Sequence, residues 1–246
     1  MPPGRAALAG QARVALAVGA SLTAAEDAVA PSLWPGGEDN TVTLVLWRHG
    51  QTAYNVEHRF QGQSDVPLNE VGLRQAAVAA RQLAALRPAA IYSSDLSRAS
   101  VTAAALAQLT GLPVQLDKDL RERSGGSWEG LTETEIAARF PAERATWTPP
   151  DGETALAVTD RAAAALERIA ASLAGGSTAV VVSHGAALGL AVARLLEIPW
   201  EPRILGPFGN CHWSVMSCRR GRWRLLEHNV GILPDPFPDG DAGAVK

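Results

Sequence analysis

The alternation of apolar and polar positions divides the chain into segments with the lengths of strands and helices. Two apolar runs, at about 41–47 and 178–183, each end in a polar segment that contains a histidine, His49 in the first and His184 in the second. Short apolar runs bounded by glycine and polar residues are typical of strands buried on both faces. We therefore expect two buried strands that each deliver a histidine to an edge of a sheet.

Apolar residues recur at intervals of three and four in four further segments, the spacing of one helix face. These helices are expected at about 70–86, 96–109, 153–173 and 186–196, with short strands at 89–93 and 113–116. Apolar and polar residues then alternate on either side of Arg219-Arg220-Gly221, which predicts a hairpin. Strands that alternate with helices predict an α/β fold: a three-layer sandwich with a mainly parallel sheet flanked by helices, plus a C-terminal β-hairpin.

Capping residues and glycines predict some of the helix ends. Ser94 and Asp95 precede the helix expected at 96–109 and are candidate N-caps, and Gly111 is expected to end that helix. The segment 50–69 contains glycines, a proline and many polar residues, so it is predicted to be a functional loop rather than a simple connection.

The composition changes at both ends of the chain. Residues 1–40 are rich in alanine, glycine and proline, and they predict an N-terminal extension that is helical or partly disordered. A signal peptide is disfavoured because Arg13 and Glu26 interrupt the pattern that such a segment requires. The main domain is expected at 41–234, followed by a disordered tail at 235–246. These features predict a cytoplasmic protein.

The chain has 246 residues, of which 47% are hydrophobic and 19% charged, with a formal net charge of −3. This composition is typical of a globular domain that buries a sizeable core. The net charge argues against nucleic acid as a partner, and no apolar run approaches the roughly 18 residues of a membrane span. Cys211 and Cys218 lack the spacing of a zinc site, so we expect reduced thiols and no metal.

The candidate chemistry lies where the predicted strands end. In open α/β sheets, ligands bind in the crevice at the C-terminal ends of the strands, where His49 and His184 are expected. Arg98 follows another strand directly, and Arg48 precedes the first histidine. Gly185 opens a helix, and the N–H groups at a helix start favour an anion. This concentration of donors and positive charge is suited to a dianionic phosphoryl group.

Taken alone, Arg48-His49-Gly50 is a weak signal, since a single histidine at a strand end more often packs in the core or faces solvent. The signal becomes specific because further motifs follow in order: Asn55, Arg59-Phe60-Gln61-Gly62, Asp65-Val66-Pro67-Leu68, Ser93-Ser94-Asp95-Leu96-Ser97-Arg98-Ala99, Leu120-Arg121-Glu122, Trp128-Glu129-Gly130 and Ser183-His184-Gly185. Over about residues 41–230, this set resembles the histidine phosphatase superfamily, in its phosphoglycerate mutase-like branch. Within that family it is most similar to actinobacterial-type phosphatases, including those that act on phosphoglycerate and glucosyl-phosphoglycerate.

The resemblance implies a role for each of these residues. His49 is expected to be the nucleophile that takes the phosphoryl group as phosphohistidine, and Glu122 the general acid that protonates the leaving oxygen and later activates water. The residues expected to bind the phosphoryl group are Arg48, Arg98 and His184, with Asn55, Gln61 and Gly62 completing the cradle. The resemblance also implies a small phosphorylated metabolite as the partner and no metal or other cofactor, and homodimers are common in the family.

Glu129 lies in the same predicted loop as Glu122 and is a second candidate for the general acid. The family's pattern favours Glu122, which ends the motif Leu120-Arg121-Glu122. The chain departs from the family directly afterwards: Arg123 and Ser124 precede the loop glycines where many members have an aromatic residue. Arg123 is therefore a candidate contact for an anionic substrate.

Two other functions fit parts of this pattern. One is a 2,3-bisphosphoglycerate-dependent phosphoglycerate mutase. Mutase members carry a longer segment between the general acid and the second histidine than the one between Glu122 and His184, which favours an open pocket with water as the acceptor. The other is a non-catalytic phospho-ligand binding module, since a fold alone does not imply catalysis. The leading prediction is a metal-independent phosphatase for small phosphomonoesters.

The remaining histidines receive structural interpretations. His58 is expected at the pocket rim or in solvent. His212 and His228 lie on the predicted hairpin, where packing or hydrogen bonding is the more common role of such residues.

Overall fold

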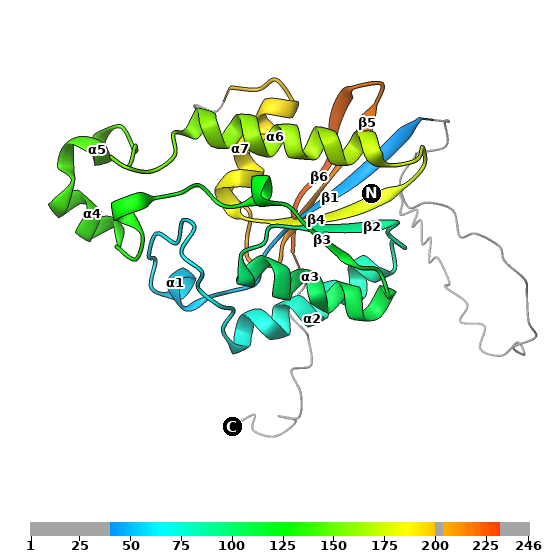
Figure 1. The fold of residues 1–246 in the computed structure, drawn as a ribbon, viewed down its shortest axis with the longest axis horizontal. Coiled ribbons are helices and arrows are strands. Elements are labelled where there is room, and N and C mark those ends of the chain that lie inside the picture. The colour runs from blue at the N-terminus through cyan, green and yellow to red at the C-terminus, as the bar shows by residue number, and fades with distance from the viewer. Residues whose placement is uncertain (1–39, 200–203, 232–246) are drawn as a thin grey trace, which may run out of the picture. The chain divides into compact units, whose positions relative to one another are not determined.

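The computed structural model describes residues 40–199 and 204–231, and within them the fold is built on one six-stranded sheet (Figure 1). The strands are β1 (Thr41–Arg48), β2 (Ala90–Ser93), β3 (Val114–Leu116), β4 (Thr178–Ser183), β5 (Trp213–Arg219) and β6 (Arg222–Val230). Their order across the sheet is β3-β2-β4-β1-β5-β6. The first four in this order run parallel, while β5 and β6 are antiparallel to their neighbours. The predicted α/β class, mainly parallel sheet and C-terminal hairpin are confirmed.

Helices cover both faces of the sheet, which produces the predicted three layers. One face is covered by α6 (Ala155–Ser172) and α7 (Gly185–Leu195), and the other by α2 (Glu70–Ala84) and α3 (Ser97–Thr110) (Figure 1). The connections contain the short helices α1 (Ala53–Val56), α4 (Glu133–Arg139) and α5 (Pro141–Ala145) and the 3₁₀ turns η1 (Lys118–Leu120) and η2 (Gly126–Trp128). None of the helices in the described ranges has the length and apolar character needed to cross a membrane.

Successive residues of β1 point to opposite layers. Leu44 and Leu46 pack with α6 and α7, whereas Val45 and Trp47 pack with α2 and α3. All four side chains are fully buried, and burial of a leucine or valine side chain contributes about 1.5–3 kcal/mol. The indole N–H of Trp47 donates to the carbonyl oxygen of Cys211 (3.2 Å), so its one polar atom is satisfied. Burial on both faces explains why this strand is a continuous apolar run in the sequence.

The register between β1 and β4 positions the site. Arg48 pairs with Ser183 at the ends of these two parallel strands. His49 and His184 are therefore the next residues on adjacent strands, and they leave the sheet at the same edge. The backbone N–H of His49 also donates to the carbonyl oxygen of Ser183 (3.0 Å), which ties the two strand ends together.

The predicted N-caps of α3 are wrong. The residue at the N-cap position is Leu96, and no side chain caps the helix. Asp95 instead accepts two hydrogen bonds from the guanidinium of Arg121, at 2.6 Å each. The hydroxyl of Ser94 is bonded to a ring nitrogen of His184 (2.9 Å). Both polar side chains thus serve tertiary contacts, which override their local preference for capping.

Other local predictions hold. Gly111 ends α3 in the left-handed conformation, with φ of 73°. The hairpin turns through Arg220 and Gly221, whose φ angles of 52° and 74° suit a two-residue turn between twisted strands. The predicted loop at 50–69 contains one helix that the pattern did not reveal, α1, which starts with a capping box between Thr52 and Asn55.

Parts of the predicted chain organisation fall outside the described residues. These are the N-terminal extension, apart from Asn40, and the C-terminal tail. Cys211 and Cys218 are both free thiols, as expected for a hairpin without a disulfide.

Candidate active site

His49 and His184 lie side by side where β1 and β4 end. Their ring centroids are 5.1 Å apart, and the ring planes are inclined at 57°. Both side chains are almost completely buried. The parallel pairing of β1 and β4 thus brings together two imidazoles that are far apart in the sequence.

The surroundings of His49 determine which of its ring nitrogens is free to react. Its Nδ1 lies 2.7 Å from the carbonyl oxygen of Gly50. A carbonyl oxygen can only accept, so Nδ1 carries the hydrogen and Nε2 keeps its lone pair in the neutral ring. Burial and the nearby guanidinium groups of Arg48 and Arg98 hold the pKa of His49 well below its usual 6.5. His49 is therefore neutral at pH 7, with a nucleophilic Nε2.

Arg98 is held rigidly from the first turn of α3. Its Nη1 donates to the carbonyl oxygen of Ser64 (2.8 Å) and its Nη2 to that of Gly62 (2.7 Å). The side chain is completely buried, and burial lowers the pKa of its guanidinium to about 10. Arg48 is anchored in the same manner, by a hydrogen bond from Nη1 to the carbonyl oxygen of Phe208 (2.5 Å). Carbonyl anchors orient both guanidinium groups without neutralising them.

Three buried nitrogens around the histidine pair have no hydrogen-bond partner in the described part of the chain. They are Nε of Arg48, Nε of Arg98 and Nδ1 of His184. Buried polar atoms are normally paired, and an unpaired one costs about 1–3 kcal/mol. Burial and the charge of Arg98 also hold the pKa of His184 well below 6.5. A cluster of such nitrogens beside two guanidinium groups is suited to a dianion such as a phosphoryl group.

Glu122 occupies the N-terminus of α7. Its carboxylate accepts hydrogen bonds from the backbone N–H groups of Ala186 (3.1 Å), Ala187 (3.0 Å) and Arg123 (2.9 Å). The helix start does favour an anion, as the sequence predicts, but the anion that it holds is this carboxylate and not a phosphoryl group. The negative charge of Glu122 also opposes the fall in pKa that burial imposes on Arg48.

The carboxylate of Glu129 has a different environment from that of Glu122. Its carboxylate accepts hydrogen bonds from the backbone N–H groups of Gln63 (2.9 Å), Ser64 (2.8 Å) and Gly125 (2.9 Å), and from the hydroxyl of Ser64 (2.5 Å). Both oxygens are therefore engaged in holding the loop that carries the anchors of Arg98. Glu129 is a structural residue of that loop.

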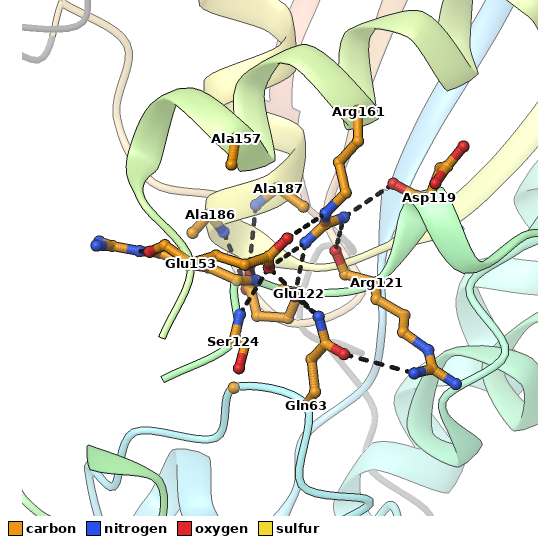
Figure 2. A network of polar contacts seen from close by, with 12 residues as sticks. Gln63, Asp119, Arg121, Glu122, Ser124, Glu153, Ala157, Arg161, Ala186 and Ala187 are labelled. Atoms are coloured by element: carbon orange, nitrogen blue, oxygen red, sulfur yellow. Dashed lines mark hydrogen bonds and ion pairs between the residues drawn. The ribbon is translucent and has the colours of Figure 1, made fainter. Parts of the chain in front are cut away.

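Figure 2 shows how α6 holds the segment that carries Glu122. The guanidinium of Arg161 donates to three backbone carbonyl oxygens of this segment: those of Asp119 (2.9 Å), Arg121 (2.7 Å) and Glu122 (2.9 Å). It also forms two hydrogen bonds of 2.7 Å with the carboxylate of Glu153. The position of the Glu122 backbone therefore depends on a side chain of α6.

A cavity of about 670 Å³ lies beside these residues. The charged residues in its lining are Arg48, Glu122 and Arg123. The rest of the wall is mostly apolar and comes from α7, from residues 198–199 and 204–208, and from Phe60 and Trp147. The histidines do not line the cavity, but their chain neighbours Arg48 and Gly185 do. The cavity therefore lies beside the ends of β1 and β4.

The sequence from residue 44 to residue 231 matches the histidine phosphatase superfamily, branch 1. The chain belongs to this superfamily. One relative, a glucosyl-3-phosphoglycerate phosphatase of Mycobacterium tuberculosis, is 41% identical over 196 residues, which cover 73% of this chain and 86% of the relative. A metal-independent phosphoserine phosphatase of Arabidopsis thaliana is 35% identical over 222 residues, which cover 83% of this chain and 91% of the relative.

Solved structures agree with this assignment. The mycobacterial glucosyl-3-phosphoglycerate phosphatase complexed with VO3 superimposes with a TM-score of 0.72 and 39% sequence identity. The match covers 77% of this chain and 99% of that one. The predicted family and its phosphoglycerate mutase-like fold are therefore confirmed.

The predicted cradle residues of this histidine phosphatase already have hydrogen-bond partners within the protein. The side-chain oxygen of Asn55 accepts from Thr52 and from the side-chain amide of Asn210 (3.1 Å). The side-chain oxygen of Gln61 accepts from the Thr52 hydroxyl (2.9 Å). The carbonyl of Gly62 is an anchor of Arg98. Phosphoryl binding by these three residues stays a prediction.

Three residues that contribute to the site were not assigned this role from the sequence. Ser94 contacts His184, and Arg161 with Glu153 holds the Glu122 segment. Ser94 was visible in a family motif, but its position before a helix suggested a cap. Arg161 lies in an alanine-rich helix, where nothing in the local pattern distinguishes it from a solvated surface residue.

The other histidines have the structural roles predicted for them. His58 is exposed. His212 contacts the side-chain oxygen of Asn229 (3.1 Å), and His228 contacts the hydroxyl of Ser214 (3.0 Å).

Proposed function

We propose that this histidine phosphatase hydrolyses small phosphomonoesters through a phosphohistidine intermediate on His49. The observation that carries the proposal is the set of unpaired buried nitrogens of Arg48, Arg98 and His184 around a neutral imidazole. These groups would donate to the phosphoryl oxygens and stabilise the charge that they carry in the transition state. The arginines supply positive charge of the kind that Mg²⁺ supplies in other phosphoryl-transfer enzymes.

In the first half of the reaction, Nε2 of His49 attacks phosphorus. The nitrogen–phosphorus bond forms while the bond between phosphorus and the ester oxygen breaks. Glu122, which lines the cavity beside Arg48, gives a proton to the departing oxygen. The leaving alcohol is then free, and the phosphoryl group remains on His49.

In the second half, water is the acceptor. The Glu122 carboxylate takes a proton from the water molecule as its oxygen attacks phosphorus. The nitrogen–phosphorus bond breaks, its electron pair returns to Nε2, and inorganic phosphate leaves. Glu122 regains its proton in this step, so the cycle closes without a net change in the enzyme.

The substrate class rests on the relatives and on the shape of the site. The relatives named above are phosphatases of glucosyl-3-phosphoglycerate and phosphoserine, which are both small phosphomonoesters. The cavity beside Arg48 and Glu122 has room for a leaving group of that size. We infer a small phosphorylated metabolite as the partner. A cytoplasmic location and a homodimer stay predictions, and light scattering of the purified protein would decide the second.

The substitution His49→Ala tests the mechanism. We expect it to lower kcat for p-nitrophenyl phosphate by about 10³-fold or more, because the attacking atom is removed. Wild-type protein quenched with base after exposure to ³²P-labelled substrate is expected to retain an acid-labile label that the variant lacks. Full hydrolysis by the variant would show that no phosphohistidine forms on His49.

The mutase alternative is decided with 3-phosphoglycerate. We expect the release of inorganic phosphate to be faster than the formation of 2-phosphoglycerate, both with and without added 2,3-bisphosphoglycerate. Isomerisation that outpaces phosphate release would replace the phosphatase assignment by a mutase one.

A further inference from the structure

Ser94 is a fully buried residue at the end of β2, and its hydroxyl contacts His184. β2 pairs with β4, and Ser93 and Val182 are partners at the ends of these strands. The backbone N–H of Ser94 donates to the carbonyl oxygen of Val182 (2.9 Å), which fixes the residue against β4. Its Oγ lies 2.9 Å from Nε2 of His184. A third strand end therefore contributes to the site, beside the two that supply the histidines.

The neighbours of the Ser94 hydroxyl determine the direction of this hydrogen bond. The backbone N–H of Leu96 donates to Oγ (3.3 Å), so the oxygen already accepts one hydrogen bond. Within the described part of the chain, the other partner of the hydroxyl is Nε2 of His184. If Nε2 carried the hydrogen, the buried hydroxyl hydrogen would have no acceptor, and buried groups left unpaired in this way are rare. The hydroxyl therefore donates and Nε2 accepts.

This direction fixes the tautomer of His184. A neutral imidazole has one N–H hydrogen, and the hydrogen bond made by one ring nitrogen decides which nitrogen carries it. Because Nε2 accepts, the hydrogen is on Nδ1, the ring nitrogen that has no partner among the described residues. Burial and the charge of Arg98 hold the pKa of His184 well below 6.5, so the ring is neutral at pH 7. Its Nδ1–H is then a free donor.

His49 has the same tautomer, but the nitrogen that it leaves free is the other one. The carbonyl oxygen of Gly50 holds the hydrogen on Nδ1 of His49 and leaves the lone pair on Nε2. The two rings, whose centroids are 5.1 Å apart, thus offer different groups: His49 a lone pair and His184 an N–H hydrogen. A phosphoryl group can use both, because its phosphorus accepts the lone pair and its oxygens accept hydrogen bonds.

We propose that Ser94 is a positioning residue that holds His184 in the Nδ1–H tautomer, so that a neutral histidine donates to a phosphoryl oxygen. The donation rests on the phosphatase function proposed above, whereas the tautomer can be measured in the free protein. Without the Ser94 hydroxyl, no partner fixes either ring nitrogen, and the Nε2–H form becomes accessible. In that form Nδ1 presents a lone pair, which repels the phosphoryl oxygens.

NMR spectroscopy measures the tautomer without any ligand. In long-range ¹H–¹⁵N spectra of ¹⁵N-histidine-labelled protein at pH 7.5, protonated and unprotonated ring nitrogens resonate in separate ranges, and His184→Asn identifies the signals of His184. We expect Nδ1 of His184 to be protonated and Nε2 to be unprotonated. In Ser94→Ala, both resonances should shift toward the Nε2–H form. Ser94→Thr retains the hydroxyl and should retain the wild-type tautomer.

Ser93→Ala is the matched control. It removes an equally buried hydroxyl from the preceding residue, one that donates to the carbonyl oxygen of Ser94 (2.8 Å) instead of a histidine. It should leave the tautomer of His184 unchanged. Two results would overturn the role of Ser94: a wild-type His184 that is Nε2–H or doubly protonated, or an unchanged tautomer in Ser94→Ala.

Kinetics and ligand titration test the donation to a phosphoryl oxygen. For p-nitrophenyl phosphate, Ser94→Ala should lower kcat/KM by about tenfold or more, the factor that a charge-assisted hydrogen bond supplies. Ser93→Ala and Ser94→Thr should stay close to the wild-type value. Inorganic phosphate, added at concentrations that inhibit turnover, should shift the Nδ1 resonance of His184. An unchanged kcat/KM in Ser94→Ala, or an unshifted resonance, would overturn the donation.

The failure of this inference can be distinguished from a failure of the proposed function. His49→Ala is assayed with the same substrate. If it hydrolyses p-nitrophenyl phosphate as fast as the wild-type enzyme, the proposed function fails, and the spectra of the free protein still decide the role of Ser94 in fixing the tautomer. If His49→Ala is inactive while His184 has the Nε2–H form, only the inference about Ser94 fails.

Discussion

At the scale of single residues, the surroundings of a side chain decide its role. Glu122 and Glu129 stand in the same stretch of sequence and have the same chemistry. The carboxylate of Glu122 faces a cavity that also contains Arg48, whereas that of Glu129 is enclosed by donors from the loop at Gln63 and Ser64. Both carboxylates accept backbone hydrogen bonds, but only Glu122 lines the cavity.

Glu122→Gln should therefore act on proton transfer and Glu129→Gln on stability. In single turnovers, Glu122→Gln is expected to slow the transfer from an alkyl phosphate by about 10²-fold or more, since an alkoxide needs a proton to leave. Transfer from p-nitrophenyl phosphate should slow far less, because p-nitrophenolate leaves without one. Rapid-quench measurements with the two substrates give this ratio.

Glu129→Gln should keep that ratio and lose stability. A neutral amide cannot accept four hydrogen bonds in the place of the carboxylate, so a loss of about 1–3 kcal/mol in the free energy of unfolding is expected. Urea denaturation measures it. If Glu129→Gln instead reproduced the leaving-group dependence of Glu122→Gln, the two roles would have to be exchanged.

At the scale of elements, the site depends on contacts between segments that are distant in the chain. β1 and β4 supply the histidines, and α3 supplies Arg98. α6 holds the Glu122 segment through Arg161 (Figure 2). Helix packing on the sheet is therefore part of how the proposed proton donor is positioned.

Arg161→Lys tests this positioning. A lysine keeps the charge but cannot span three carbonyl oxygens and the Glu153 carboxylate together. We expect kcat for an alkyl phosphate to fall by about tenfold or more while KM changes little, because a displaced general acid affects the transition state rather than binding. A parallel rise in KM with unchanged kcat would argue against positioning.

The matched control on the same helix is Arg168→Lys. Arg168 is more exposed, and it pairs with the side chains of Asp117 and Asp119 rather than with the Glu122 backbone. It should leave kcat close to the wild-type value.

At the scale of the whole molecule, the site lowers the stability of the fold in acid. His49 and His184 are buried as neutral rings, and burial holds the pKa of both well below 6.5. The unfolded chain binds protons at both residues as the pH falls through 6.5, whereas the folded chain does not. The free energy of unfolding must therefore decrease as the pH falls below 6.5.

With two such histidines, the slope can approach about 2.7 kcal/mol per pH unit. Urea denaturation at several pH values between 7.5 and 5.5 measures this slope. Most carboxylates titrate below this pH range, so they contribute little to it. His184→Asn should remove about half of the slope. A free energy of unfolding that stays constant over this range would mean that the histidines are not buried as neutral rings.

Much of the fold was predictable because it depends on local periodicity. The runs that became β1 and β4 are buried on both faces, so they are continuous in apolar residues, and the helices bury one face each. Short-range signals were also reliable where the backbone alone decides, as at Gly111. They failed at Ser94 and Asp95, where tertiary partners were available.

The order of motifs along the chain was sufficient to predict the family, and the catalytic roles that it implies for His49, Arg48, Arg98, Glu122 and His184 stay predictions. Each motif can be recognised in the sequence because its chemistry requires particular side chains. Which nitrogen of His49 is free and which glutamate lines the cavity were decided only by the tertiary structure. Burial, hydrogen-bond partners and charge separation arise from contacts between distant segments, and a linear pattern does not contain those distances.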